Sequence, residues 1–349
     1  MSALAQQAEP AGDAAGLDGD RLSAFLAKSF PHGGTDLVVE PTVGGMSNPT
    51  FFVTYGGRHM VLRKQPGSVL AKSAHAIDRE FRVMTALRGS AVPVPEPILY
   101  HAEADVLDTP FYLMERIEGR VITTYAMPGL SPEERRRSYD AMARALAAIH
   151  RFDWAAASLS DYGRPGNYFS RQLSRWSQQW EQFRTDDNPY LDPVIAWLSA
   201  RVPPSETLVL CHGDFRIGNL MFGAHEPAVV GVLDWELSTL GHPLVDLAFN
   251  TQAWQMAPDE NGGLQGLPIA ELGIPSEDEY LESYYRYAGS AERMETFHKV
   301  FAMFRGAVGS AGVAARGRAG NASFAEAATV GGKLAVAYAK RGLELIERA

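Results

Sequence analysis

The first third of the chain alternates apolar and polar residues in the manner of β-strands. The stretches DLVVEPTV, TFFVTY and HMVLRK are bounded by turn residues, and Gly56-Gly57 joins the last two. This pattern predicts a hairpin closed by a two-residue turn. Extended stretches follow at PILYH and PFYLMERI, and we expect FYLMERIEG to form an edge strand. Helices are predicted from Asp20 and over 72–88.

Beyond Gly119 the apolar spacing becomes helical. In SPEERRRSYDAMARALAAIH, Ser131 is a suitable N-cap, Pro132 suits the first helical position and Glu134 completes a capping box. Apolar periodicity predicts further helices over 190–201, 243–256, 276–288, 291–312 and 323–347, and a core-facing aromatic stripe at Trp176, Trp180 and Phe183. Only residues 207–234 interrupt the helices with strands.

These two regimes predict an α+β fold with two lobes. A chain of 349 residues is longer than one hydrophobic core usually organises. We expect a disordered lead-in over residues 1–20, a β-rich lobe over 21–117 and a mainly helical lobe over 118–349.

Composition narrows the class of protein. Hydrophobic residues make up 46% and charged residues 21%, with no apolar run of the roughly 20 residues that a membrane helix needs. The net charge of −9, without a dense basic tract beyond the helical run 135–137, argues against a nucleic-acid partner. The N-terminus lacks a secretory pattern, and Cys211 has no second cysteine to pair with, which favours a cytoplasmic protein. We expect Cys211 to be a buried strand residue without chemistry.

Polar residues with potential chemistry gather in the run LVLCHGDFRIGNLMF. His212, Asp214 and Asn219 lie in its polar loop, and a hairpin over LMF and AVVGVLD would return Asp234 beside that loop. Two carboxylates and an amide oxygen form a ligand set that Mg²⁺ prefers. The alternative is structural, with Asp214 and Asn219 capping a turn and Asp234 ending a strand.

The spacing H-x-D-x-x-x-x-N, followed by an Asp on the next hairpin, is the protein-kinase arrangement. The nucleotide-binding parts would then lie in the first third of the chain. Gly44, Gly45, Ser47 and Asn48 offer backbone N–H groups to phosphates, although they match neither G-x-G-x-x-G nor the Walker pattern.

Basic and acidic residues of the same region complete the set of residues that we expect to bind the nucleotide. Arg63 in VLRK stands where a kinase has the Lys of V-A-I-K, with Lys64 beside it, and a strand turns only one of the two toward the site. The match favours Arg63, paired with Glu80 of the following helix. Backbone groups of Glu115 and Ile117 would bind an adenine edge.

The order of these motifs resembles a known family. GGMSN, VLR, the helical Glu, LMERIEG, LAAIH, CHGDFRIGN, VLDWE and GHPLVDLA, over about residues 35–315, look like the aminoglycoside phosphotransferase and choline kinase group, which shares the protein-kinase fold. The pattern HGD-x-x-x-x-N followed by I/L-D-W-E is fairly specific for this group. The resemblance implies a bilobal kinase-like fold, ATP and Mg²⁺ as cofactors, and phosphorylation of a small-molecule hydroxyl.

Carried over residue by residue, the resemblance makes Asp214 the catalytic base and Asn219 and Asp234 the metal ligands. His212 joins the catalytic group by shaping the loop rather than by transferring protons, and Asp246 supports that loop. DWE replaces DFG, and no APE segment follows, which argues against a regulated protein kinase. The helices over 153–205 and after 270 would build the acceptor pocket.

Arg in VLR, together with LMERxxG and GHPLVDLA, is similar to kinase-like domains associated with acyl-CoA dehydrogenases. This favours a metabolic hydroxyl acceptor, such as a hydroxyacyl thioester, over an antibiotic. An aminoglycoside or choline-type kinase, a nucleotide-binding pseudokinase and a metal-dependent hydrolase remain as alternatives.

Overall fold

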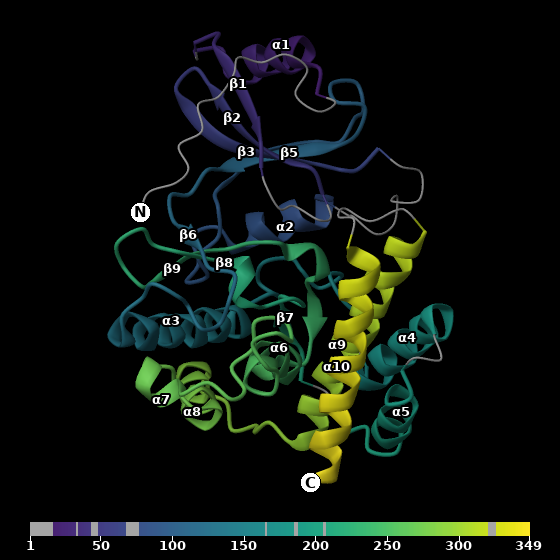
Figure 1. The fold of residues 1–349 in the computed structure, drawn as a ribbon. Helices are drawn as coiled ribbons and strands as arrows, with labels where there is room; N and C mark the ends of the chain where they lie inside the picture. Colours follow the sequence, from purple (N-terminus) through teal and green to yellow (C-terminus); the bar gives the residue numbers. More distant parts are fainter. Residues whose placement is uncertain are drawn as a thin grey trace. The chain divides into compact units, whose positions relative to one another are not determined.

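The computed structural model describes residues 17–32, 34–42, 48–67, 77–164, 166–184, 188–204, 207–319 and 326–349. They form two compact units (Figure 1). The N-terminal unit extends to Arg88 and resumes over Pro95–Ile117, and the C-terminal unit comprises Gly89–Val94 and the chain from Glu118 onward. Most of the expected lead-in lies outside the described residues. Within the described ranges, no helix combines the length and the apolar character that crossing a membrane would require.

The N-terminal unit is built on a five-stranded antiparallel sheet with the order β1-β2-β3-β5-β4. The predicted hairpin of β2 and β3 is confirmed, and both turn glycines, Gly56 and Gly57, have positive φ. The bounds of its elements are α1 (Gly19–Ser29), β1 (Leu37–Pro41), β2 (Thr50–Tyr55), β3 (Arg58–Lys64), α2 (Ile77–Leu87), β4 (Pro97–His101) and β5 (Phe111–Glu115).

Alternation along β3 assigns its side chains to two faces of the sheet. Met60 and Leu62 lie in a hydrophobic core with Leu22 and Leu26 of α1. Arg63 points to the opposite face, where α2 packs. Because successive strand residues face opposite sides, one strand serves both the core and a polar cluster.

The expectation that β5 is an edge strand is wrong. β5 lies between β3 and β4, and β4 forms the edge. The physical reason is burial on both faces, since Phe111, Tyr112 and Leu113 are each at most 1% exposed. A continuous apolar run is typical of an interior strand, whereas in β4 only Pro97 is buried and Ile98 is exposed.

The C-terminal unit is mainly helical. α3 begins with the predicted capping box, in which the Ser131 hydroxyl accepts from Glu134 N–H and the Glu134 carboxylate accepts from Ser131 N–H. α4, α5, α9 and α10 share one core around Trp180, and α9 and α10 lie side by side (Figure 1). The helices are α3 (Pro132–Arg151), α4 (Tyr168–Phe183), α5 (Leu191–Ser199), α6 (Pro243–Thr251), α7 (Ile269–Leu272), α8 (Glu277–Ala288), α9 (Thr296–Arg318) and α10 (Ala327–Glu347).

Two small sheets interrupt these helices. β8 (Leu220–Phe222) and β9 (Val229–Val232) form the predicted hairpin, with β6 (Arg120–Val121) added at its side. β7 (Val209–Cys211) pairs with β10 (Thr239–Gly241). The expectation that strands are confined to 207–234 is therefore wrong. β6 and β10 contain too few residues to produce a detectable alternation, and their pairing depends on distant strands.

Candidate functional site

Asp246 of α6 holds the polar loop after β7 by hydrogen bonds to the loop backbone. This carboxylate is fully buried, and it accepts hydrogen bonds from the backbone N–H groups of His212 at 2.6 Å and Gly213 at 2.9 Å. Burial alone would raise the pKa of Asp246, but the neighbouring His150 and the hydrogen bond from Gly213 N–H bring it below its usual value. The carboxylate therefore stays ionised and supports the loop.

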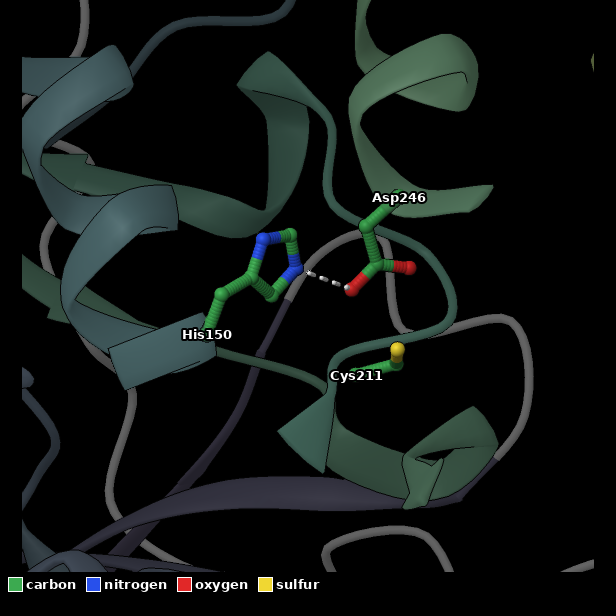
Figure 2. A group of neighbouring side chains, drawn as sticks. All are labelled: His150, Cys211 and Asp246. Carbon is green, nitrogen blue, oxygen red and sulfur yellow. Dashed lines mark ion pairs between the residues drawn. The ribbon is translucent and has the colours of Figure 1, made fainter. Parts of the chain in front are cut away.

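His150 reaches this carboxylate from α3. Its Nε2 lies 3.5 Å from Asp246 Oδ2, and Cys211 stands beside the pair (Figure 2). The other ring nitrogen of His150 lies 2.6 Å from the Tyr284 hydroxyl. Burial raises the pKa of the Cys211 thiol well above its usual value, so the thiol stays protonated at neutral pH. Together these residues form the buried support of the loop.

His212 uses both of its ring nitrogens to shape the loop. Its Nε2 donates to Leu233 O at 2.9 Å, and its Nδ1 accepts from Asp214 N–H at 3.2 Å. This pattern requires the neutral imidazole with the proton on Nε2. The ring is fully buried. Both of its hydrogen bonds are to backbone groups.

Asp214 and Asn219 lie side by side in the loop. Asn219 Nδ2 donates to both the backbone oxygen and Oδ2 of Asp214, at 2.9 and 2.8 Å. The Asp214 side chain is 21% exposed, and Arg216 Nε lies 3.3 Å from its Oδ2. Burial raises the pKa of Asp214, although the positive charge of Arg216 and the Asn219 hydrogen bond partly oppose the shift. The carboxylate is consequently more basic than an ordinary Asp.

The β8–β9 hairpin leads the chain back to Asn219 just before Asp234. Leu233 N–H donates to Asn219 O at 2.8 Å, so Asp234 follows directly on a residue bonded to Asn219. The negative charge of Asp234 contributes to the raised pKa of Asp214. Asp234 has left-handed backbone, with φ 66° and ψ 63°, which costs a non-glycine residue on the order of 1 kcal/mol.

The donor set fits a hard divalent cation. Because the amide nitrogen of Asn219 is committed to Asp214, its Oδ1 is the atom that remains for another partner. The carboxylates of Asp214 and Asp234 add further oxygens. Oxygen ligands with room for phosphate and water are what Mg²⁺ prefers.

In the N-terminal unit the structure brings Arg63 and Glu80 together. Arg63 Nε lies 3.1 Å from Glu80 Oε2, and Glu80 is 1% exposed. Lys64 points to the other face of the sheet, where its Nζ donates to Leu107 O at 3.0 Å. Burial lowers the pKa of Lys64, and the charge of Asp108 opposes this shift. Arg63 is therefore the basic residue that shares a face with Glu80.

Of the other residues predicted to contact the nucleotide phosphates, the structure describes only Asn48. Gly44, Gly45 and Ser47 lie outside the described residues. Asn48 is buried, and its Nδ2 donates to Glu80 Oε1 at 3.0 Å, a contact that the sequence did not indicate. The Tyr112 hydroxyl also donates to Glu80, at 2.9 Å. Arg63, Asn48 and Tyr112 thus all contact Glu80.

Glu115 and Ile117 stand at the end of the N-terminal unit. The N–H of Glu115 donates to Glu96 O at 2.9 Å. Of the two backbone groups of Glu115, the N–H is therefore already in use. Ile117 is the last residue of the unit.

Sequence reasoning missed Arg305 of α9. Its Nη2 donates to Gly213 O at 2.8 Å, so it contacts the loop that carries Asp214. Arg305 is only 8% exposed. A charged residue inside the apolar run VFAMFRGAV is the available signal, since a cation among core residues needs a specific partner.

Curated relatives share the sequence over most of this chain. The chain is 39% identical to acyl-CoA dehydrogenase family member 11 of Gallus gallus over 342 residues, which cover 95% of this chain and 44% of the relative. It is 39% identical to acyl-CoA dehydrogenase family member 10 of Mus musculus over 287 residues, 81% of this chain and 27% of the relative. The chain thus spans less than half the length of these relatives.

Solved structures share the fold. A putative aminoglycoside phosphotransferase from Ralstonia eutropha is 40% identical, with a TM-score of 0.85 over 95% of this chain and 99% of that one. A choline kinase from Cryptosporidium parvum has a TM-score of 0.66 over 95% of this chain and 97% of that one, and at 13% identity it supports the fold alone. Both confirm the predicted bilobal, protein-kinase-like α+β fold.

The aminoglycoside phosphotransferase APH(4)-Ia, solved with ADP and hygromycin B, gives a TM-score of 0.60 at 16% identity, over 93% of this chain and 98% of that one. Residues 38–294 match the model of the phosphotransferase enzyme family, APH. This match covers more than half of the chain, and the predicted resemblance is confirmed. The chain belongs to the phosphotransferase enzyme family.

Proposed function

We propose that the protein transfers the γ-phosphate of ATP to a hydroxyl group of a small molecule. The observation that carries this proposal is the Asp214 carboxylate, held by Asn219 Nδ2 at 2.8 Å and influenced by the charge of Asp234. In the reaction the acceptor oxygen forms a bond to the γ-phosphorus, the bond to the β–γ bridging oxygen breaks, and ADP leaves. The hydroxyl proton passes to Asp214.

Asp214 acts as the base. It orients the acceptor hydroxyl and takes its proton late in the transfer. A raised pKa strengthens a carboxylate as a base. Asn219 fixes the side chain, and His212 fixes the peptide that precedes it.

Asn219 and Asp234 would hold Mg²⁺ through Oδ1 and a carboxylate oxygen. When bound with ATP, Mg²⁺ offsets the negative charge that develops on the phosphate oxygens. The left-handed backbone of Asp234 supports this assignment, since strain of this kind persists where a side chain must be aimed.

The N-terminal unit supplies the nucleotide contacts. Arg63 donates to phosphate oxygens while its ion pair with Glu80 fixes the guanidinium. Backbone N–H groups of the segment 44–48 add phosphate contacts. Because the Glu115 N–H is bonded to Glu96, the contact of Glu115 with adenine falls to its carbonyl oxygen, and Ile117 offers its N–H.

The acceptor we favour is a hydroxyacyl-CoA or a related hydroxylated metabolite. Relatives that are 39% identical over most of this chain are named as acyl-CoA dehydrogenase family members. The choline kinase and the APH(4)-Ia complex with hygromycin B are at most 16% identical to this chain, and they support the fold alone. An acceptor of the aminoglycoside or choline type is the alternative.

A screen of ATP consumption tests the function. The protein is incubated with Mg·ATP and a panel of hydroxyacyl-CoA thioesters, free hydroxy acids, choline and aminoglycosides, with Asp214→Ala as the blank. We expect ADP formation that depends on a hydroxylated acceptor and a phosphorylated product detected by mass spectrometry. ATP binding without transfer to any acceptor would identify a pseudokinase. Phosphate release from a monoester without ATP would identify a hydrolase, and either result would overturn the proposal.

A further inference from the structure

We propose that Arg305 is a positioning residue for the loop that carries Asp214. With Asp246 it forms a buried pair of opposite charges, joined through the backbone of Gly213 rather than by direct contact. The functional part of this inference rests on the role proposed for Asp214. The structural part does not depend on that role.

The burial of Arg305 requires an explanation. The side chain is 8% exposed, and its Nε and Nη1 have no hydrogen-bond partner among the described residues. The rings of Phe249 and Trp176 lie 5.3 and 5.7 Å from its guanidinium carbon, which offsets part of the desolvation cost. Arg305 forms no ion pair with a carboxylate of the described ranges, and a buried cation of this kind is expensive and is found where it has a specific role.

Arg305 and Asp246 hold Gly213 from opposite ends. Gly213 N–H donates to Asp246 Oδ1 at 2.9 Å, and Gly213 O accepts from Arg305 Nη2 at 2.8 Å. Both are hydrogen bonds to a charged group, which are stronger than bonds between neutral groups. The negative charge faces an N–H and the positive charge faces a C=O, so each stabilises the orientation of its peptide group.

The peptide bond between Gly213 and Asp214 is fixed at both of its polar atoms. Its oxygen accepts from Arg305, and its N–H donates to His212 Nδ1. Because a peptide group is planar and rigid, these two contacts set the direction in which the Asp214 side chain leaves the backbone. Arg305 therefore acts on the reaction through the orientation of Asp214.

The loop needs such support because glycine gives its backbone conformational freedom. Gly213 has φ +85°, and a Cβ atom built there would lie 2.3 Å from Leu237 O, so only glycine fits. Glycine adopts this conformation without strain but leaves many others open, so the surrounding contacts select the one observed. Without Arg305, the bond to Gly213 O is lost and the following peptide can rotate.

Arg305→Met tests the role, since methionine removes the charge and the donors but keeps an unbranched apolar chain. Arg305→Lys keeps the charge and a donor. Asn188→Leu is the matched control, because Asn188 is also buried and donates to a backbone oxygen, that of Ala335 in α10, at 3.1 Å. Amide hydrogen exchange of residues 211–219 is measured for all three variants and for the unmodified protein, together with kcat and KM for ATP.

For Arg305→Met we expect faster exchange confined to the loop, a fall in kcat of roughly 10- to 100-fold and a KM for ATP within about twofold of the original. Compared with Arg305→Met, Arg305→Lys should show slower exchange in the loop and a higher kcat. Asn188→Leu should match the unmodified protein in both loop exchange and kcat. Unchanged exchange in the loop would overturn the proposal. An increase spread equally over α4, α6 and α9 would assign Arg305 a packing role and overturn it as well.

The two proposals can fail separately. If the unmodified protein transfers phosphate to no acceptor, the proposed function fails, while the exchange measurement still decides whether Arg305 holds the loop. If the unmodified protein is active and Arg305→Met keeps its full kcat, the positioning role fails and the proposed function stands.

Discussion

Glu80 of the N-terminal unit and Asp214 of the C-terminal unit are both predicted functional carboxylates, but their surroundings suit them to different tasks. Glu80 is 1% exposed and is held by Arg63, Asn48 and Tyr112. Asp214 is partly exposed, and its pKa is raised by burial. A carboxylate held on all sides orients its partners, whereas a basic and accessible carboxylate can accept a proton.

Asp214→Asn should separate chemistry from binding and stability. We expect kcat to fall at least about 10³-fold, within the range for a lost general base, while Mg·ATP binding persists. Because burial disfavours the ionised carboxylate, the variant should melt at or above the temperature of the unmodified protein at pH 7. Turnover assays, nucleotide titration and thermal unfolding give the three values. Near-normal turnover would remove Asp214 from the role of base.

At the scale of elements, the short β7–β10 sheet positions the loop. β10 supplies Gly241, and a Cβ at this position would lie 2.6 Å from Cε2 of Tyr168. Gly241→Ala should therefore cost about 1–3 kcal/mol of unfolding free energy through overpacking, and it should reduce kcat as β7 shifts.

Gly309→Ala is the control for that variant. Gly309 lies within α9, and a Cβ there meets nothing within 4 Å. Alanine in a helix should instead stabilise the protein by roughly 0.5–1 kcal/mol. Both free energies follow from urea denaturation. Equal stability of the two variants would argue against tight packing at β10.

The start of α9 gives the protein a pH-dependent stability. His298 Nδ1 accepts from Glu295 N–H at 3.1 Å, and burial, with the charge of His242, lowers the pKa of His298 to about 4. A pKa lowered by folding contributes stability that is present above about pH 6.5 and is lost as the pH falls toward 4. The full contribution is roughly 3 kcal/mol.

His298→Gln should flatten this dependence, because glutamine keeps the capping acceptor but does not titrate. Thermal unfolding between pH 7 and pH 4.5 gives the comparison. An equally steep loss of stability in the variant would show that other groups cause the acid sensitivity.

Long elements were predictable from the sequence, and tertiary pairings were not. The capping box of α3 and the β2–β3 and β8–β9 hairpins depend on neighbouring residues, so local patterns predicted them. β6 and β10 are stabilised by strands far along the chain. The edge position of FYLMERIEG was wrong because sheet order depends on such pairings.

The same distinction holds within the site. The contact between Asp214 and Asn219 and the hairpin that leads to Asp234 were predictable from spacing, since both involve residues close in the sequence. The bond from Arg305 to Gly213 spans 92 positions, and that from Asn48 to Glu80 spans 32. No local pattern encodes contacts of this kind.

At the scale of the whole molecule, ligand binding should increase the free energy of unfolding. A ligand that binds only the folded state at 100 times its Kd adds about 2.7 kcal/mol. We expect ATP with Mg²⁺ to raise the melting temperature more than ATP with a chelator does. Asp234→Asn should lose the metal-dependent part, whereas Asp214→Asn should retain most of it. Differential scanning fluorimetry provides the measurement, and a full metal-dependent shift in Asp234→Asn would exclude Asp234 as a ligand.

The left-handed backbone of Asp234 has a consequence for engineering. Glycine would relieve the strain at φ 66°, and neutral residues at 214 would relieve the desolvation of a buried charge. A library of this chain selected for heat resistance alone should therefore replace these two aspartates early. Activity would disappear from the survivors while their fold improved, and the positions lost first would mark the residues that selection for function had kept.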